Sequence, residues 1–161
     1  MPVSLRESVG RISDPRNLDA TVEEVFALML GCACSPVPGV ALNDRESLMA
    51  VVGFGGLLSG ACFLRCGAGT AMTMAGRMMS ATFTELDATV QDAIGELCNM
   101  LAGGWKSRIP ELSSHCGLSV PAIITGSDYQ MRVHPLQFQL SQSYRFDNLP
   151  FEVTILCEAL Q

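Results

Sequence analysis

The amino-acid sequence predicts an α+β fold, in which an antiparallel sheet packs against two longer helices and one shorter helix. Three observations lead to this prediction. The segments 18–30, 68–80 and 85–104 have the composition or the apolar spacing of helices. Several short segments elsewhere are rich in β-branched residues and partly alternate between apolar and polar. The helical segments precede and interrupt these strands without a regular strand–helix–strand rhythm, which favours antiparallel pairing.

The first predicted helix covers residues 18–30, a segment that contains no Gly or Pro and ends at Gly31. Before it, residues 1–16 are polar and include two prolines, so we expect a flexible N-terminal lead-in. Residues 17–161 are predicted to form a single domain, because 161 residues suffice for one proper core and are too few for two ordinary domains.

The middle of the chain predicts a loop, a hairpin and a short helix. Residues 32–47 contain two prolines and a glycine, which indicate a loop or an irregular edge. The apolar runs 48–54 and 57–66 are separated by Gly55–Gly56, a spacing typical of a β-hairpin. Residues 68–80 then predict a shorter helix, whose methionines are expected to contribute to the core.

The strongest helical pattern covers residues 85–104. It begins with the capping pattern Thr84-x-x-Asp87, which places the first helical residue at Glu85, and we expect Gly103–Gly104 to end it. After Pro110 the pattern becomes that of strands, and four are predicted: 118–125, 129–133, 136–140 and 150–156. The last of them closes a hairpin across a turn at Asp147–Asn148.

Composition excludes several classes of protein. The net charge is −6 and the ten basic residues are scattered, which argues against a nucleic-acid partner. The longest apolar stretch, 48–64, is interrupted by glycines and is no membrane span, and residues 1–10 lack the apolar core of a secretory signal. The seven cysteines have no zinc spacing and are interpreted as buried thiols, so we expect a cytoplasmic protein in a reducing compartment.

The polar side of the long predicted helix carries the candidate functional residues. At ~100° per residue, four residues fall near one line: Asp92, Glu96, Asn99 and Gly103. A solvated helix face usually mixes charge signs, whereas Asp92 and Glu96 place like charges together, and Asn is a poor residue inside a helix. The small Gly95 and Gly103 would let another protein approach closely. The residues alone leave two interpretations open, an ordinary solvated face and a surface for protein docking.

The pattern Asp92-x-x-x-Glu96-x-x-Asn99, followed by 21 residues and Pro121, resembles the signature of the CheC/CheX/FliY chemotaxis phosphatases. Glu-x-x-Asn alone is a common pattern, and the four-part spacing in its hydrophobic setting is what makes the resemblance specific. The distance from Asn99 to Pro121 is one residue shorter than in the family pattern, a difference that loop length can absorb. The resemblance extends, in the order of elements, from about Asp19 onward.

The first predicted helix resembles a degenerate second copy of this motif. An alignment of the two helices pairs them position by position: Asp19 with Asp92, Glu23 with Glu96, and Phe26 with Asn99. In CheC-like relatives both copies can carry the Glu and the Asn. Here the first copy lacks the amide, so Glu23 is interpreted as a solvated or capping carboxylate. One intact site and one degenerate copy indicate a CheX-like member with a CheC-like pseudo-repeat.

The resemblance implies a phosphatase that acts on the phospho-aspartate of a CheY-like response regulator in two-component signalling. The receiver domain would carry Mg²⁺ and a lysine, so no cofactor or metal of the chain's own is expected. Asn99 would orient the attacking water and Glu96 would dock on the receiver, since the phosphatase has mainly to position groups. Asp92 and Pro121 would support them. CheX-like members pair through their sheets, which implies a homodimer, and neither nucleic acid nor a membrane is expected as a partner.

Other interpretations remain open beside this one. His115 next to Cys116 suggests a thiol nucleophile, although no third orienting group is apparent. The glycines of 53–56 lack a following Lys-Ser/Thr and so form no phosphate-binding loop. A non-catalytic adaptor could dock receivers or flagellar-switch partners through the same helix. A structural dimer module, in which the polar line is incidental, is a further alternative.

Overall fold

A computed structural model of the chain describes residues 5–38, 47–126 and 135–161. Its helices are η1 (Leu5–Ser8), α1 (Val9–Ile12), α2 (Pro15–Leu30), α3 (Ala68–Met79) and α4 (Ala88–Ser107). Its strands are β1 (Ser35–Pro36), β2 (Ser47–Gly56), β3 (Leu58–Gly67), β4 (Cys116–Leu118), β5 (Ala122–Gly126), β6 (Phe138–Phe146) and β7 (Leu149–Leu160).

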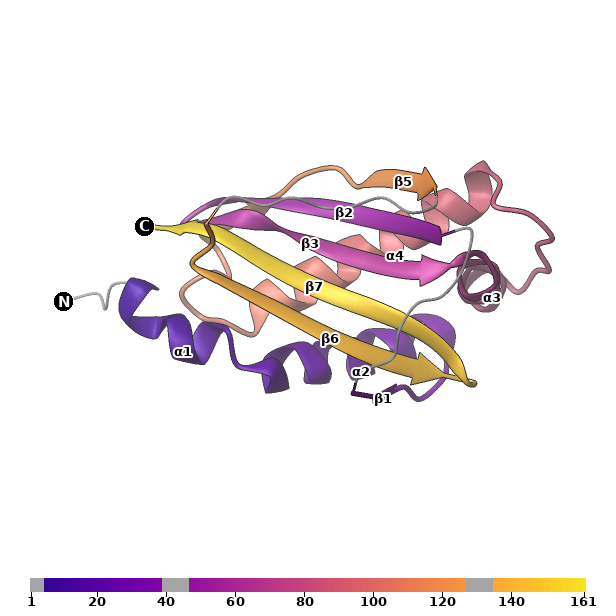
Figure 1. Cartoon of the computed structure of the whole chain (residues 1–161), viewed down its shortest axis with the longest axis horizontal. Coiled ribbons are helices and arrows are strands. Elements are labelled where there is room, and N and C mark those ends of the chain that lie inside the picture. Colours follow the sequence, from indigo (N-terminus) through magenta and orange to yellow (C-terminus); the bar gives the residue numbers. More distant parts are fainter. Residues whose placement is uncertain (1–4, 39–46, 127–134) are drawn as a thin grey trace.

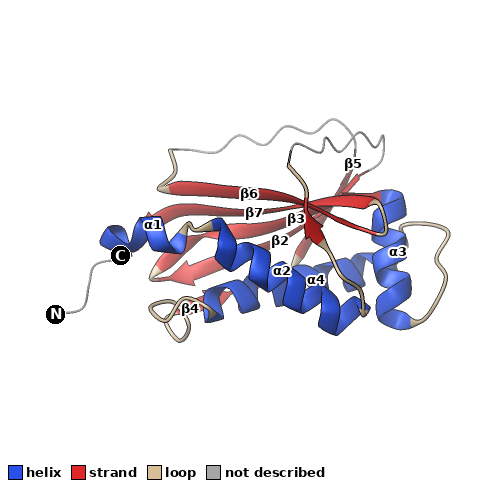
Figure 2. Cartoon of the chain, turned by 90° about the horizontal axis from the view of Figure 1, so that it is seen from below, coloured by secondary structure: helices blue, strands red, loops and turns tan. Residues whose placement is uncertain are grey.

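The strands form one antiparallel sheet in the order β1-β6-β7-β3-β2-β4, and β5 also pairs with β2, along its first half, whereas β4 pairs with its last three residues (Figure 1). Helices α2 and α4 lie side by side and run in opposite directions across one face of the sheet, and α3 stands at its end (Figure 2). The predicted α+β class, with two longer helices and one shorter one, is therefore confirmed. Within the described residues, no helix is long and apolar enough to cross a membrane.

The core lies between this sheet face and the helices. Phe54 of β2 meets the ring of Trp105 of α4 at a centroid distance of 5.5 Å, and the two side chains are buried. Phe26 of α2 stacks on Phe151 of β7 at 4.5 Å. The thiol of Cys98 lies 3.6 Å from the carbonyl oxygens of two strand residues beneath α4. Helices α2 and α4 are thus fixed to the sheet through side chains along their inner faces.

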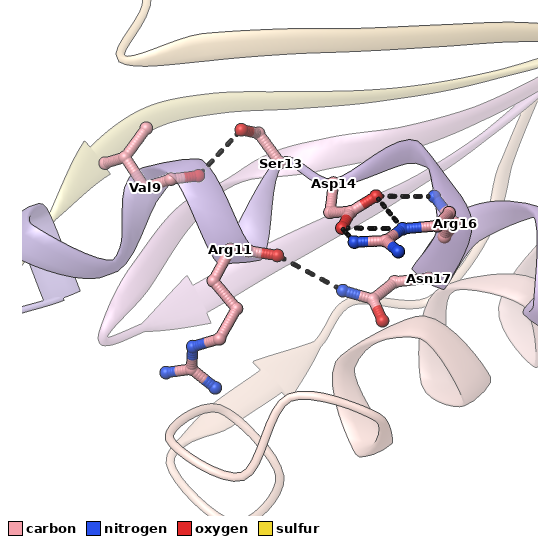
Figure 3. A network of polar contacts seen from close by, with 6 residues as sticks. All are labelled: Val9, Arg11, Ser13, Asp14, Arg16 and Asn17. Carbon is pink, nitrogen blue, oxygen red and sulfur yellow. Dashed lines mark hydrogen bonds and ion pairs between the residues drawn. The ribbon is translucent and has the colours of Figure 1, made fainter.

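The start of the first long helix differs from the sequence prediction. Helix α2 begins at Pro15, earlier than the predicted Leu18, because Asp14 caps it by accepting a hydrogen bond from the backbone N–H of Arg16 at 3.0 Å (Figure 3). The predicted lead-in, 1–16, is helical over residues 5–12, and Ile12 is fully buried in the core. The division into a lead-in and a domain at residue 17 stays a prediction.

The other elements follow the prediction with shifted boundaries. The β2–β3 and β6–β7 hairpins are confirmed, and Asp147–Asn148 have the positive φ angles, 47° and 63°, of a two-residue hairpin turn. Helix α3 matches residues 68–80 closely. The predicted strand 118–125 is two short strands, β4 and β5. The predicted strand 129–133 lies outside the described residues.

Helix α4 is displaced by about one turn from its predicted range. The predicted cap at Thr84 is wrong: the helix starts at Ala88, because the Asp87 carboxylate caps it by accepting a hydrogen bond from the N–H of Val90 at 2.9 Å. It continues past the two glycines to Ser107. The glycines do not end the helix because Gly104 lies against α2: a Cβ there would be 3.0 Å from the methyl of Thr21. The absence of a side chain serves helix packing at this position and does not terminate the helix.

Candidate active site on helix α4

The polar line of α4 faces away from the sheet. The opposite side of the helix is apolar and packs into the core, which fixes the orientation of α4. Its residues include Ile94, Leu97 and Leu101, each without solvent exposure. Asp92 and Glu96 are exposed, and Asn99 is half-buried. Within the part of the chain that the structure describes, no ion pair or hydrogen bond engages these three side chains. A carboxylate and an amide, one helical turn apart, are therefore available to an external group.

The connection between β4 and β5 forms one flank of this line. A Cβ on Gly95 would lie 3.3 Å from Cβ of Pro121 and 3.5 Å from Cδ1 of Ile123, so the proline ring lies against α4 immediately beside Glu96. The connection is held to the sheet by Ser119, whose N–H donates to the Gly53 carbonyl at 2.9 Å. The Gly53 N–H in turn donates to the Ser119 hydroxyl at 2.8 Å. The structure thus brings Pro121 to the residues with which the sequence motif groups it.

Helix α2 forms the other flank. A groove of about 470 Å³ runs between α2 and α4, and Leu28 and Met100 lie on its opposite walls. At one end of the groove, Arg108 of α4 makes an ion pair with Glu24 of α2 and donates to the Ala20 carbonyl at 3.4 Å. The exposed line of α4 therefore projects between two neighbouring elements. We call it the ridge; its polar side chains are Asp92, Glu96 and Asn99.

The residues of the predicted degenerate copy lie apart from this ridge. Oδ1 of Asp19 accepts hydrogen bonds from the Tyr144 hydroxyl at 2.7 Å and from Nε2 of Gln142 at 3.1 Å, both on β6. Burial, and then the bond to Asp19, raise the pKa of Tyr144 well above its usual value, so the phenol stays protonated as the donor. Phe26 is fully buried and Glu23 is exposed. Asp19 and Phe26 hold α2 to the sheet, and the sequence did not predict the partners on β6.

The cysteines and the neighbouring histidine form no comparable site. His115 is exposed, while Cys116 is buried and its thiol lies 3.8 Å from the Leu58 carbonyl. Burial raises the pKa of the Cys116 thiol, and it raises that of Cys34 to about 12, so both are protonated at neutral pH. All seven cysteines are free thiols. Among the described residues, no three His, Cys, Asp or Glu side chains are grouped as around a metal ion.

Two comparisons of the sequence with known proteins identify the family of this chain and one of its relatives. A family model described as "Chemotaxis phosphatase CheX" matches residues 48–144, a range that contains all of α4 and Pro121. The curated relative "CheY-P phosphatase CheX" of Thermotoga maritima is 30% identical over 88 residues. That match covers 54% of this chain and 57% of the relative, so the chain spans little more than half the relative's length.

Solved structures share the fold. CheX in a complex with CheY, BeF3 and Mg²⁺ from Borrelia burgdorferi has a TM-score of 0.74 at 17% identity, over 89% of this chain and 97% of that one. CheX from Desulfovibrio desulfuricans also has a TM-score of 0.74, at 18% identity over 89% and 98%. FliY of Thermotoga maritima has a TM-score of 0.67 at 18% identity, over 96% and 89%.

Proposed function

Because the chain belongs to the CheX family of chemotaxis phosphatases, we propose that it hydrolyses the phospho-aspartate of a CheY-like response regulator. The observation that carries the proposal is the ridge of α4, on which the Glu96 carboxylate and the Asn99 amide have no partner within the described residues. Unpaired polar groups that face outward, beside a fixed proline, are suited to enter the phosphorylated pocket of another protein.

Glu96 anchors the receiver in this proposal. A CheY-like receiver carries a lysine next to its phosphorylated aspartate, and the exposed carboxylate of Glu96 can form a charge-assisted hydrogen bond with it. The Glu96 side chain is exposed, so its carboxylate is open to this lysine. Asp92 lies one turn earlier and adds negative charge on the same line.

Asn99 positions the water. Its amide oxygen accepts a hydrogen bond from the water, and the lone pair of the water oxygen is then directed at phosphorus. The new bond joins the water oxygen to phosphorus, the bond from phosphorus to the aspartate oxygen breaks, and the products are inorganic phosphate and a free aspartate. The receiver's own Mg²⁺ balances the charge on the phosphoryl oxygens, so the chain's residues act by positioning.

Pro121 and Gly95 keep this geometry constant. The contact between the proline ring and the helix flank fixes the β4–β5 connection beside Glu96, with no side chain on Gly95 to push it away. Reaction geometry depends on such fixed neighbours, because small displacements of positioned groups lower the rate strongly. The predicted pairing of two copies stays a separate proposal, which sedimentation velocity can test.

Timed phosphate release from a phosphorylated receiver tests the proposal. The wild-type chain is expected to accelerate release at catalytic concentrations, whereas Glu96→Gln weakens binding of the receiver by loss of charge. A chain that binds the receiver and leaves its lifetime unchanged would instead be the non-catalytic adaptor considered above. A chain that neither binds nor accelerates release would contradict both functions.

A further inference from the structure

Large apolar side chains are exposed at four positions in the described part of the chain: Leu28 at 73%, Met79 at 51%, Val120 at 86% and Ile124 at 43%. Such side chains, when scattered singly over a surface, require no explanation. Leu28 and Val120 are different, because they belong to the two elements that flank the polar ridge of α4. They belong to the same surface as Glu96 and Asn99 if they lie beside these two residues along the axis of α4.

Leu28 lies at the level of the catalytic residues on the α2 side. Because α2 and α4 run in opposite directions, residues later in α2 lie beside residues earlier in α4 (Figure 2). Thr21 lies against Gly104, and Leu28, two turns further, lines the groove opposite Met100. Met100 follows Asn99 directly, so Leu28 lies at the same level along α4 as the water-positioning residue.

Val120 lies at the same level on the other side. The segment from Leu118 to Pro121 runs along α4: Cδ1 of Leu118 would be 3.7 Å from a Cβ on Gly103, and Cβ of Pro121 would be 3.3 Å from one on Gly95. Val120 lies between these two contacts in the chain. Its side chain is the most exposed of the four and stands beside the stretch of α4 that holds Glu96 and Asn99.

We propose that Leu28 and Val120 are the apolar flanks of the receiver-docking surface, and that each is covered by the phosphorylated receiver when its pocket closes over Glu96 and Asn99. This inference rests on the proposed function. An occupant that covers both flanks must also cover the ridge between them, because the polar side chains stand in the middle. The surface then has the arrangement of a protein interface, with a charged centre for the reaction and apolar contacts on two sides.

The charge of the ridge indicates which partner fits. Asp92 and Glu96 are both acidic and have no basic neighbour bound to them in the described residues. A second copy docked through the same face about a twofold axis would bring these carboxylates against their own equivalents. A partner with a cationic group at its centre meets the ridge without this repulsion. A receiver that presents its lysine has that chemistry.

Kinetics over a range of phosphorylated-receiver concentrations separates docking from chemistry. Leu28→Ser and Val120→Ser are each expected to raise KM about tenfold with kcat unchanged, since each removes one buried apolar contact. The double variant is expected to raise KM by about 100-fold, because the two side chains lie on opposite sides of α4 and make separate contacts with the receiver. Asn99→Ala has the opposite effect, a lower kcat with little change in KM.

Ile124→Ser is the matched control. Ile123 points at α4, so its neighbour Ile124 points to the opposite face of the sheet, and its replacement is expected to leave KM unchanged. The Kd of each variant for the receiver activated with beryllofluoride is measured in parallel. The role of Leu28 and Val120 in docking can then be tested even if the chain binds the receiver without hydrolysing its phosphate. An unchanged KM and Kd in the double variant would overturn the inference while wild-type turnover upholds the proposed function. A shift in oligomeric state with unchanged receiver affinity would overturn it in favour of a second copy.

Discussion

Replacing Asn99 by alanine is expected to lower activity and to leave the fold slightly more stable. The Asn99 side chain is half-buried and, within the described residues, has no hydrogen-bond partner whose loss would cost stability. Alanine is the better helix residue by roughly 0.5 kcal/mol, because asparagine competes with the helical backbone for hydrogen bonds. For a chain of this length such a gain raises Tm by about 1–2 °C.

The loss of activity is expected to be much larger. Removal of one preorganised polar group lowers the rate by about 10²–10³ in enzymes of known mechanism, which corresponds to roughly 3–4 kcal/mol of transition-state stabilisation. The assay is phosphate release from a saturating phosphorylated receiver, with thermal unfolding of the same samples. Glu158→Ala changes an exposed residue of β7, outside the ridge, and serves as the control, with unchanged kcat.

Two results would refute this reasoning. If Asn99→Ala retained full kcat, the amide would not position the water. If instead Tm fell by several degrees, Asn99 would be a structural residue, and the loss of activity would follow from distortion of α4. The two effects are expected to have opposite signs, which an ordinary destabilising substitution cannot reproduce.

Three further substitutions test the elements around the site. Asp19→Ala removes the acceptor of the buried Tyr144 hydroxyl, so urea denaturation should show a free energy of unfolding lower by about 1–3 kcal/mol, with kcat unchanged. Lost activity at full stability would instead show that the first copy of the motif still functions. Gly95→Leu forces a side chain into the space of Pro121 and should lower kcat in the phosphate-release assay, whereas full activity would mean that this contact is dispensable. Phe26→Ala should cost about 3–5 kcal/mol in denaturant titrations, and a cost near zero would contradict its role in the core.

The parts of the fold that local patterns determine were predictable. Apolar spacing indicates α4 and separates its polar line from its buried side, although the cap is Asp87 and not Thr84, where the predicted capping pattern began. The two-residue turn at Asp147–Asn148 was predictable because these residue types tolerate the positive φ angles that the turn requires. The position of Glu96 and Asn99 on an outward-facing line followed from the same periodicity.

The remaining features depend on contacts between distant segments. Gly104 does not end α4, because packing against Thr21 overrides its poor helix propensity. The hydrogen bond from Tyr144 to Asp19 joins residues 125 positions apart, so no helical pattern in α2 could indicate it. The exposure of Leu28 could not be foreseen either, since an apolar residue inside a helix is ordinarily expected to face the core.

The most direct test of the account is the lifetime of a phosphorylated CheY-like receiver in the presence of a small molar fraction of the chain. If the ridge of α4 carries the reaction, one molecule dephosphorylates many receivers, and the lifetime falls in proportion to the amount of chain added. A lifetime equal to that of the receiver alone, at concentrations at which the two proteins bind, would contradict the central claim.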